Sequence, residues 1–224
     1  NEAIAFPTKD TDEYPPYTLS QAMKYGWMWR IPTQGRWGNG YVFNNNYINS
    51  DQAKKEVEDF LGYEIDIFKN IKFDPGCLDK IWINNCMTVG LSSSFLEPLE
   101  ATSIGTTINQ MFLFLNYIQN YNEKNILDFN KKIKLIIDNT RDFVLLHYVT
   151  DRQDTDFWKD IKNVKLPNSL INNLEKWKTK LPIEEDMENS QYLLFRQTNF
   201  LSVLYGMNYF DRNAIKNEYD SLSN

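Results

Sequence analysis

Two glutamates, three residues apart, are the side chains in this sequence that are best spaced to carry out chemistry. Glu97 and Glu100 flank a proline, and the small hydroxylated residues Thr102 and Ser103 follow them. A carboxylate can accept a proton from a reacting carbon or stabilise developing positive charge. The same residue types also cap ordinary helices. From the residues alone that ordinary interpretation is favoured, including a capping box formed by Ser94 and Glu97.

An apolar stripe begins shortly after the two glutamates. It predicts the helix that positions them. Its residues recur in steps of four and three: Ile104, Ile108, Met111, Leu115 and Ile118. This is the period of a helix with one buried face, so we expect a long, well-buried helix over about 104–120. Glu100 and the two hydroxylated residues then lie at or just before its first turn. Unpaired backbone N–H groups and the positive end of the helix dipole suit that end to an anion, such as a halide, a phosphate or a charged flavin ring.

The part of the chain before this helix reads as short strands and turns. Alternation in the segment 26–32 predicts a strand that places Trp27, Trp29 and Ile31 on one face. A turn at 33–35 leads to a partner strand over 36–43, and on the residues alone the tryptophans are packing residues. We also expect an opening strand followed by a loop within 1–25, and short strands at 71–73, 81–83 and 87–89. A helix capped by Ser50 and ended by Gly62 has the apolar positions Ala53, Val57, Phe60 and Leu61.

The part after residue 104 reads almost entirely as helix. Beyond 104–120, helices are predicted over about 124–148, 167–180 and 189–208, with a short one opening at Trp158. The fold class is therefore α+β. The single histidine, His147, continues the apolar stripe of the second helix, so it is interpreted as a packing residue rather than a catalyst.

Composition excludes several classes of function. A net charge of −6 and a pI near 4.9 argue against nucleic acid and anionic membranes as partners. No apolar run reaches 18 residues and no signal-peptide pattern opens the chain, so we expect a cytoplasmic protein. Cys77 and Cys86 do not have a metal-binding spacing, and free buried thiols are expected. With a single histidine, neither a histidine-based metal site nor a Ser-His-Asp triad is expected.

Several uncommon motifs resemble the flavin-dependent tryptophan halogenase family. They are Gly26-Trp27-x-Trp29-x-Ile31-Pro32, Gly35-Arg36-x-Gly38-x-Gly40-Tyr41-Val42-Phe43, Asn84-Asn85-Cys86 and Gly90-Leu91-Ser92-Ser93-x-Phe95-Leu96-Glu97-Pro98-Leu99-Glu100. Arg141-Asp142-Phe143-Val144, His147-Tyr148 and Asp154-Thr155-x-Phe157-Trp158 follow in the same order. The resemblance extends to about residue 180, and it favours functional over structural roles for Glu100 and the tryptophan pair.

The resemblance implies a reaction and a role for each matched residue. Family members use reduced flavin, oxygen and halide to make hypohalous acid, which crosses a tunnel to an electron-rich aromatic substrate. The activating glutamate matches Glu100, and the halide and flavin contacts match Thr102, Ser103 and Ile104, with the halide at Thr102 and Ser103. The tryptophan motif, here Trp27, Trp29, Ile31 and Pro32, lines the separation between flavin and substrate.

The chain departs from the family pattern at three matched positions. Ala101 stands where the family usually has serine, Ser103 where it has glycine, and Asp156 where it has proline. The family's glycine-rich flavin motif and its catalytic lysine belong to an earlier part of the sequence. The chain, which starts at Asn1 rather than Met, therefore resembles the C-terminal part of such a protein. Residues 1–103 would end a flavin-monooxygenase-like FAD domain, and 104–224 would form a helical substrate module.

Three functions compete at this point: part of an aryl halogenase, part of a related flavin monooxygenase, or a non-catalytic helical binding module. The first implies FAD reduced by a flavin reductase, chloride, bromide or iodide as halide, and the N-terminal half of the same protein as a partner. The sequence is also compatible with a homodimer. Tyr192 and Phe195 are the expected substrate contacts. Because the region 184–206 contains no tryptophan, we predict an aromatic substrate other than free tryptophan.

Overall fold

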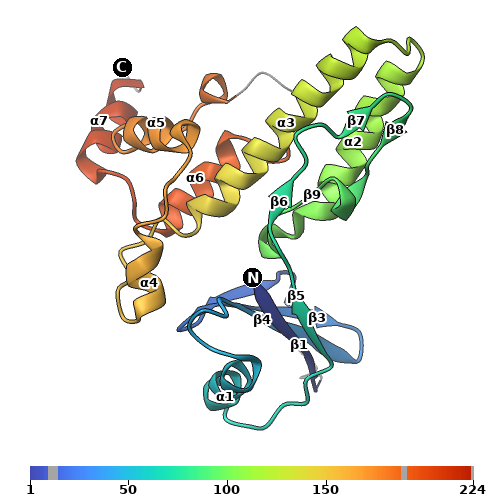
Figure 1. Ribbon diagram of the computed structural model, residues 1–224. Helices are drawn as coiled ribbons and strands as arrows, with labels where there is room; N and C mark the ends of the chain where they lie inside the picture. Colours follow the sequence, from blue (N-terminus) through green and yellow to red (C-terminus); the bar gives the residue numbers. More distant parts are fainter. Residues whose placement is uncertain (10–14, 188–190, 223–224) are drawn as a thin grey trace. The chain divides into compact units, whose positions relative to one another are not determined.

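The computed structural model describes residues 1–9, 15–187 and 191–222, and within them the chain forms two compact units (Figure 1). Unit 1 comprises Asn1–Pro75 and Asp151–Asn163, and unit 2 comprises Gly76–Thr150 and Val164–Asn224. The mixture of sheet and helix confirms the predicted α+β class. The predicted domain boundary after residue 103 concerns the complete protein and stays a prediction, since the compact units divide elsewhere.

Unit 1 is an antiparallel sheet with one face covered by a helix. Five strands pair in the order β2-β3-β4-β1-β5, and the register places Trp29 beside Gly40 and Trp27 beside Val42. The strands are β1 (Glu2–Thr8), β2 (Leu19–Ala22), β3 (Gly26–Thr33), β4 (Arg36–Phe43) and β5 (Lys69–Lys72), and the helices are α1 (Ser50–Leu61) and α4 (Asp156–Ile161). Met28, Tyr41 and Phe43 form the buried core with Ala53 and Val57 of α1.

Most predicted elements of unit 1 are confirmed, but β2 lies in a segment predicted as loop, α4 begins at Asp156 and not at Trp158, and α1 differs in two details. Gly62 ends α1 in the left-handed conformation, as expected. The N-cap, however, is Asn49, whose side chain accepts from the Gln52 amide while Ser50 donates its hydroxyl to Glu2. Phe60 is half-exposed instead of buried, because Ala53, Val57 and Leu61 are the residues of that helix that pack against the sheet core.

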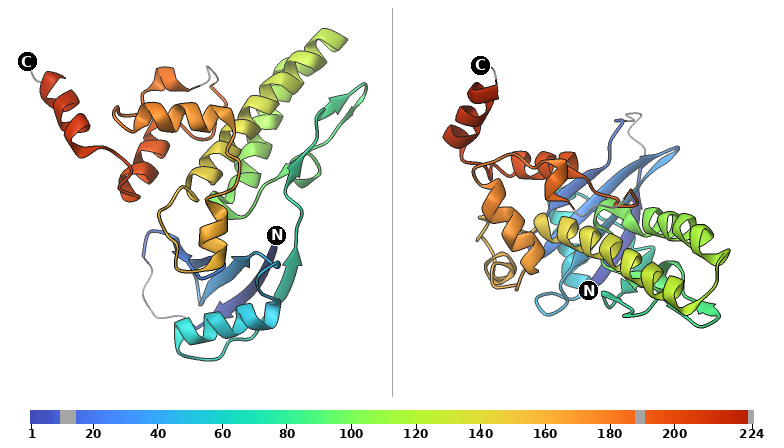
Figure 2. Two further views of the ribbon diagram at one scale, coloured as in Figure 1. Left: turned by 60° about the vertical axis from the view of Figure 1, so that its left-hand side comes forward. Right: turned by 90° about the horizontal axis from the view of Figure 1, so that it is seen from above.

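Unit 2 is a long helical hairpin with shorter helices beside it. α2 (Thr102–Ile118) and α3 (Glu123–Leu146) lie side by side, and the figures show the hairpin in three views (Figure 1, Figure 2). The remaining helices are α5 (Asn168–Trp177), α6 (Gln197–Gly206) and α7 (Arg212–Leu222), with 3-10 turns η1 (Gly90–Ser92), η2 (Leu99–Ala101) and η3 (Glu184–Asp186). Short pairs join β6 (Gly76–Cys77) to β9 (Ser94–Phe95) and β7 (Trp82–Ile83) to β8 (Cys86–Met87).

The predicted helix over 189–208 is correct only in its second half. Residues 191–196 are not helical, and α6 begins at Gln197 because the Asn199 side chain accepts from the Arg196 amide there. Residues 188–190 of that prediction lie outside the described ranges. The cysteines are free, as expected, but both are exposed, since each lies on a two-residue edge strand instead of in a core.

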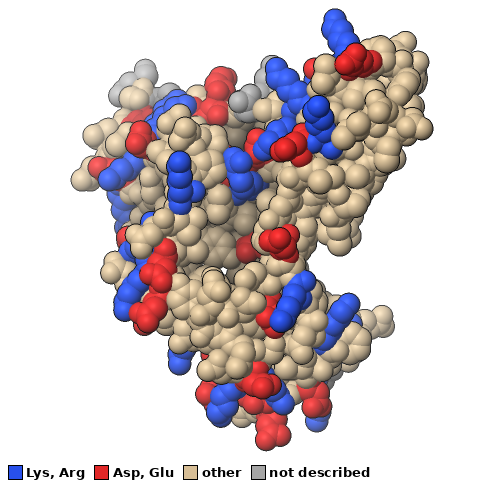
Figure 3. All heavy atoms as spheres, viewed as in Figure 1, with Lys and Arg blue, Asp and Glu red and all other residues tan. Residues whose placement is uncertain are grey.

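The apolar stripe of α2 is exposed, which corrects the main packing prediction. The exposed fraction of the stripe residues lies between 38% and 74%, and that of Phe112 beside them is 59%. The stripe residues are Ile104, Ile108, Met111, Leu115 and Ile118. The buried side of α2 instead carries Thr102, Gln110, Leu113 and Tyr117. None of the 17 residues of α2 is charged. In Figure 3 Lys and Arg side chains of unit 2 lie over α3 and over the helices on the left, whereas the right-hand side of the hairpin is mostly free of them.

Candidate active site

The two glutamates contact two consecutive residues at the end of α3. The Tyr148 hydroxyl donates to both carboxylate oxygens of Glu97, each at 2.9 Å. His147 Nε2 lies 3.2 Å from Glu100 Oε1. Since α3 ends at Leu146, these partners are the first residues beyond it. The glutamates are therefore fixed against α3, and the capping box suggested by the sequence does not form: Ser94 lies in β9, and α2 begins later, at Thr102.

The backbone around Glu100 is strained. Glu100 and Ala101 both have left-handed conformations, with φ of 65° and 49°. Such a conformation costs a residue with a Cβ about 1–2 kcal/mol. The turn is held by the buried side chain of Leu99 and by the Ala101 amide, which donates to Pro98 O at 2.9 Å. The result is a Glu100 side chain that keeps 38% of its surface exposed.

The first turn of α2 lacks a capping side chain. The N-cap position is Ala101, which has no hydrogen-bonding side chain. Serine, threonine, aspartate and asparagine are the usual residues there, because they accept from the second or third amide. The hydroxyls of Thr106 and Thr107 donate to carbonyls of the first turn and do not cap its amides. The amide end beside Glu100 therefore fits an anion or the electron-rich edge of a flat ring.

The loop that carries the glutamates is tied to α2 by buried polar contacts. Gln110 of α2 donates to Thr88 O at 2.6 Å, and its side-chain oxygen accepts from the Ser93 hydroxyl at 3.5 Å. Both side chains are buried, so they fix the loop more firmly than surface contacts would. This explains why the Gly90–Glu100 motif contains serines and why a glutamine lies on the inner face of an otherwise apolar helix.

The carboxyl group of Glu97, three residues before Glu100, has a perturbed pKa. Burial raises the pKa of Glu97 from 4.5 to about 7, while the hydrogen bond from Tyr148 acts in the opposite direction. A carboxyl group with such a pKa is partly protonated near neutral pH. Glu97 is thus hydrogen-bonded and half-buried, whereas Glu100 is accessible.

The tryptophan motif lies on the face of the unit 1 sheet that is opposite to α1. Alternation along β3 places Met28 in the α1 core and Trp27 and Trp29 on the other side. The rings of the two tryptophans are 5.9 Å apart, and a Cβ on Gly40 would lie 2.0 Å from the Trp29 ring. The Trp29 ring therefore packs directly on Gly40. Any larger residue at this position of β4 would clash with the ring.

This open face of the sheet is hollowed beside Trp29. A cavity of about 480 Å³ is lined by Trp29, Arg36 and Phe68 and by small residues such as Ala5 and Gly38. Within the described residues, the buried indole N–H of Trp27 has no acceptor. Ile31 is exposed and Pro32 half-buried on the same strand. The motif thus presents aromatic surface and a donor, which is compatible with lining a ligand cavity.

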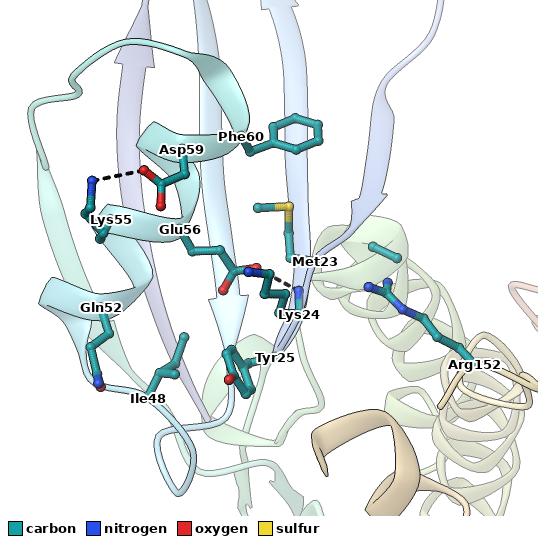
Figure 4. A pocket seen from close by; sticks show the side chains of 11 residues that line it. Met23, Lys24, Tyr25, Ile48, Gln52, Lys55, Glu56, Asp59, Phe60 and Arg152 are labelled. Carbon is teal, nitrogen blue, oxygen red and sulfur yellow. Dashed lines mark hydrogen bonds and ion pairs between the residues drawn. The ribbon is translucent and has the colours of Figure 1, made fainter. Parts of the chain in front are cut away.

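A second cavity of unit 1 lies against α1 and has a volume of about 510 Å³ (Figure 4). Its charged groups are used within the protein: Glu56 accepts from the Lys24 amide and the Tyr41 hydroxyl, and Lys55 pairs with Asp59. Arg152 at its edge pairs with Asp154. A ligand in this cavity would therefore have to compete with hydrogen bonds and ion pairs that these charged groups already form within the protein.

The expected substrate residues are packed within unit 2. Phe195 stacks on Phe143 at 3.9 Å, and Phe200 packs against the edge of Phe143 at 5.1 Å. Tyr192 is half-buried, with its carbonyl bound by Asn109 and its hydroxyl by Asn116. These contacts favour the structural interpretation of the aromatic residues in this region, and their role in substrate binding stays a prediction.

His147 is the residue that the sequence interpretation underrated. It packs against the edge of Phe143, as a core residue would, yet one ring nitrogen faces Glu100. Glu100 and His147 are 47 positions apart and lie on different elements, so no local spacing links them. Among the described residues, no group of three or more metal-ligating side chains is found, and no helix is long and apolar enough to span a membrane.

Comparison with known proteins assigns the family. The family model described as tryptophan halogenase matches residues 1–220. The tryptophan 6-halogenase SttH of Streptomyces toxytricini is 35% identical over 178 residues, covering 77% of this chain and 34% of the relative. The chain therefore spans about a third of the length of the curated relatives that it matches.

Solved structures agree with the sequence comparison. Xcc4156, a flavin-dependent halogenase from Xanthomonas campestris, superposes with a TM-score of 0.86 at 31% identity, covering 94% of this chain and 43% of that one. Tar14, a tryptophan C-6 flavin-dependent halogenase from taromycin biosynthesis, gives 0.85 at 30% identity with the same coverage. The chain belongs to the flavin-dependent tryptophan halogenase family.

Proposed function

We propose that the complete protein is a FAD-dependent halogenase that uses reduced flavin, oxygen and halide to make hypohalous acid and halogenates an electron-rich aromatic substrate. Family membership supports this proposal for the whole molecule, of which these residues are one part. The observation that carries it is the placement of Glu100. An accessible carboxylate on a strained turn, next to an uncapped helix end, costs stability, so a functional reason for keeping it is favoured.

Glu100 acts as the base in this proposal. When an electrophilic halogen adds to an aromatic ring, the ring carbon must lose a proton to restore aromaticity. A carboxylate within reach accepts that proton, and its negative charge also stabilises the cationic ring before the proton leaves. Glu100 has the exposure that this role requires, while Glu97 is half-buried and bound by Tyr148.

The residues after Glu100 would hold the anionic components. The backbone amides of Thr102, Ser103 and Ile104, at the uncapped end of α2, would bind the halide and the edge of the flavin ring, with the halide at Thr102 and Ser103. Bound flavin supplies the oxidising power for the halide. No Gly-x-Gly-x-x-Gly pattern occurs in the 224 residues, so the pyrophosphate would be held by the N-terminal half of the protein.

The exposed face of α2 supports the existence of that further part. A helix without charged residues is normally buried on most sides, yet six large apolar side chains of α2 are more than a third exposed. The N-terminal half would cover this face. Residues 1–103 would then complete its FAD domain and 104–224 would form the substrate module.

The remaining roles follow from the family. Trp27, Trp29, Ile31 and Pro32 would line the passage between flavin and substrate, and Tyr192 and Phe195 would border the substrate. Chloride, bromide or iodide would serve as halide. A flavin reductase would supply reduced FAD in the cytoplasm, and a homodimer is one assembly to be tested. The substrate is proposed to be an arene other than free tryptophan, with tryptophan as the competing choice.

The test is Glu100→Gln in the complete protein, supplied with a flavin reductase, bromide and a panel of indole, phenol and tryptophan. We expect the rate of bromination to fall about a hundredfold or more while flavin reoxidation continues, because only the proton-accepting charge is lost. Glu123→Gln, which changes an exposed carboxylate at the start of α3, should leave both rates unchanged.

Other outcomes distinguish the alternatives. Hydroxylated instead of brominated product would indicate a flavin monooxygenase, and no turnover of any arene by the reduced-flavin enzyme would favour a binding module. Equal loss of bromination and flavin reoxidation in Glu100→Gln would place Glu100 at the flavin or in the fold. The highest kcat/KM on tryptophan would overturn the substrate proposal alone.

A further inference from the structure

The two ring nitrogens of His147, the single histidine, each make a contact, and together these contacts decide which nitrogen carries the hydrogen. His147 Nδ1 lies 2.9 Å from the carbonyl oxygen of Phe143, one turn earlier in the chain. A carbonyl oxygen can only accept, so Nδ1 carries the hydrogen. In the neutral ring Nε2 is then a bare acceptor, and this nitrogen faces Glu100 Oε1 at 3.2 Å. Two acceptors thus meet at hydrogen-bond distance, with room for one proton between them.

The end of α3 fixes this tautomer. The last carbonyls of a helix have no partner within the helix. The His147 amide donates to Val144 O, so the imidazole of the same residue is left to satisfy Phe143 O. The ring is also held by the edge of Phe143 at 5.0 Å. Nε2 is therefore presented to Glu100 by backbone geometry.

The two helix ends complement the charges that the pair would carry. Glu100 lies beside the N-terminus of α2, where the helix dipole attracts an anion, and His147 follows the C-terminus of α3, where it attracts a cation. A carboxylate at one end and an imidazolium at the other is the arrangement that both dipoles favour. The ring keeps 20% of its side-chain surface exposed, so a proton on it can reach solvent.

We propose that His147 receives the substrate proton from Glu100 during halogenation. This inference rests on the function proposed above. The C–H bond of the halogenated ring carbon breaks, its electron pair restores the aromatic ring, and the proton forms an O–H bond on Glu100. That bond breaks in turn as an N–H bond forms on His147 Nε2. Glu100 becomes a carboxylate again, and the imidazolium beside it returns the proton to solvent.

Two further titratable groups, Glu97 and Tyr148, lie next to this pair in the chain. The Tyr148 hydroxyl donates to both Glu97 oxygens. Glu97 complicates a pH profile, because its pKa of about 7 falls where an imidazole also titrates. Measurements made in a Glu97→Gln background remove that group from the profile.

The first experiment measures single-turnover bromination by the complete protein against pH, with the panel arene that reacts fastest. His147→Gln can still donate a hydrogen bond to Glu100 but cannot accept a proton. We expect it to be at least tenfold slower near neutral pH and to lose the inflection due to imidazole. Added imidazole should restore part of the rate in His147→Ala. Lys131→Gln, an exposed change on α3, is the matched control.

The second experiment is independent of activity. Nitrogen NMR of the histidine-labelled protein, with the His147 signal assigned by difference from His147→Gln, reports which nitrogen carries the hydrogen. We expect the neutral ring to carry its hydrogen on Nδ1.

Two results would overturn the relay while leaving the proposed halogenase intact: an Nε2–H tautomer, or a His147→Gln variant with the wild-type rate and pH profile. Failure of the wild-type protein to brominate any arene would instead reject the proposed function itself.

Discussion

α1 and α2 are both amphipathic, yet they begin and pack in opposite ways. α1 starts at Asn49, whose side chain closes a full capping box, and its apolar residues Ala53 and Val57 are completely buried against the sheet. α2 starts at Ala101, which cannot cap, and its apolar stripe is exposed. In α1 the first turn has a side-chain cap and the apolar residues are buried. In α2 the first turn has no side-chain cap and the apolar stripe is exposed.

The difference between α1 and α2 suggests a structural role for α1 and a functional role for the start of α2. A helix whose amides are capped and whose face is covered contributes to stability and has nothing left to offer a ligand. A helix with a free amide end, preceded by a strained glutamate, is less stable than it could be, and such local costs concentrate at functional sites. The comparison predicts that equivalent substitutions on the two helices will have unequal and sometimes opposite effects.

The largest contrast is expected from placing a carboxylate on each apolar face. Val57→Asp buries a charge that has no partner, and we expect it to destabilise the 224-residue chain by about 4 kcal/mol or more. Ile108→Asp lies on a half-exposed position and should cost about 1 kcal/mol or less. Urea unfolding followed by circular dichroism measures both.

The complete protein provides the control for that contrast. If the N-terminal half covers α2, Ile108→Asp should become strongly destabilising there, with a melting temperature several degrees lower. An Ile108→Asp protein that melts like the wild type in the complete form would show that this face of α2 stays in solvent.

The sequence predicted the elements of unit 1 well because their signals are local. Alternation of Trp27, Met28 and Trp29 defines a strand, and Gly62 ends a helix through its own conformational freedom. The N-cap was misassigned by one residue because Asn49 and Ser50 are both good caps, and only the bond from Ser50 to Glu2, 48 positions away, decides between them. The periodicity of α2 correctly predicted a helix, but periodicity cannot say which chain segment covers the apolar face.

The candidate site was harder to predict than the fold. The spacing of Glu97 and Glu100 singled out the right segment, and the family resemblance identified which glutamate to follow. The left-handed turn at Glu100 and Ala101 has no sequence signal, since neither residue favours that conformation. The contact with His147 depends on two elements meeting in space. Long-range contacts of this kind are visible only in the structure.

A smaller effect on the unfolding free energy is expected from the carboxyl group of Glu97, which precedes α2. Because the folded state raises the pKa of Glu97 from 4.5 to about 7, it favours the protonated form. The associated stability is fully present below pH 4.5 and is lost as the pH rises through 7, by about 3 kcal/mol. We expect the unfolding free energy to decline between pH 5 and 8, and Glu97→Gln to flatten that decline.

Other carboxyl groups act in a different pH range, which makes the experiment interpretable. The pKa of Asp128 is lowered by the Tyr117 hydrogen bond and that of Asp154 by Arg152. Their contributions are lost only as the pH falls below about 4, their ordinary range. A decline between pH 5 and 8 that persists in Glu97→Gln would therefore have to come from another group, and the assignment to Glu97 would be wrong.

The smallest effects, and the sharpest difference in sign, are expected at the helix starts. Asn49→Ala removes the capping-box bond that the Asn49 side chain accepts from the Gln52 amide, and it should destabilise the chain by about 1 kcal/mol. Ala101→Gly relieves a left-handed residue at the start of α2 and should stabilise it by about 0.5–1 kcal/mol. Denaturant midpoints of the two variants, measured beside the wild type, test both signs. Loss of stability in Ala101→Gly would mean that the turn at Glu100 is unstrained, and the argument that its geometry is kept for function would lose its physical basis.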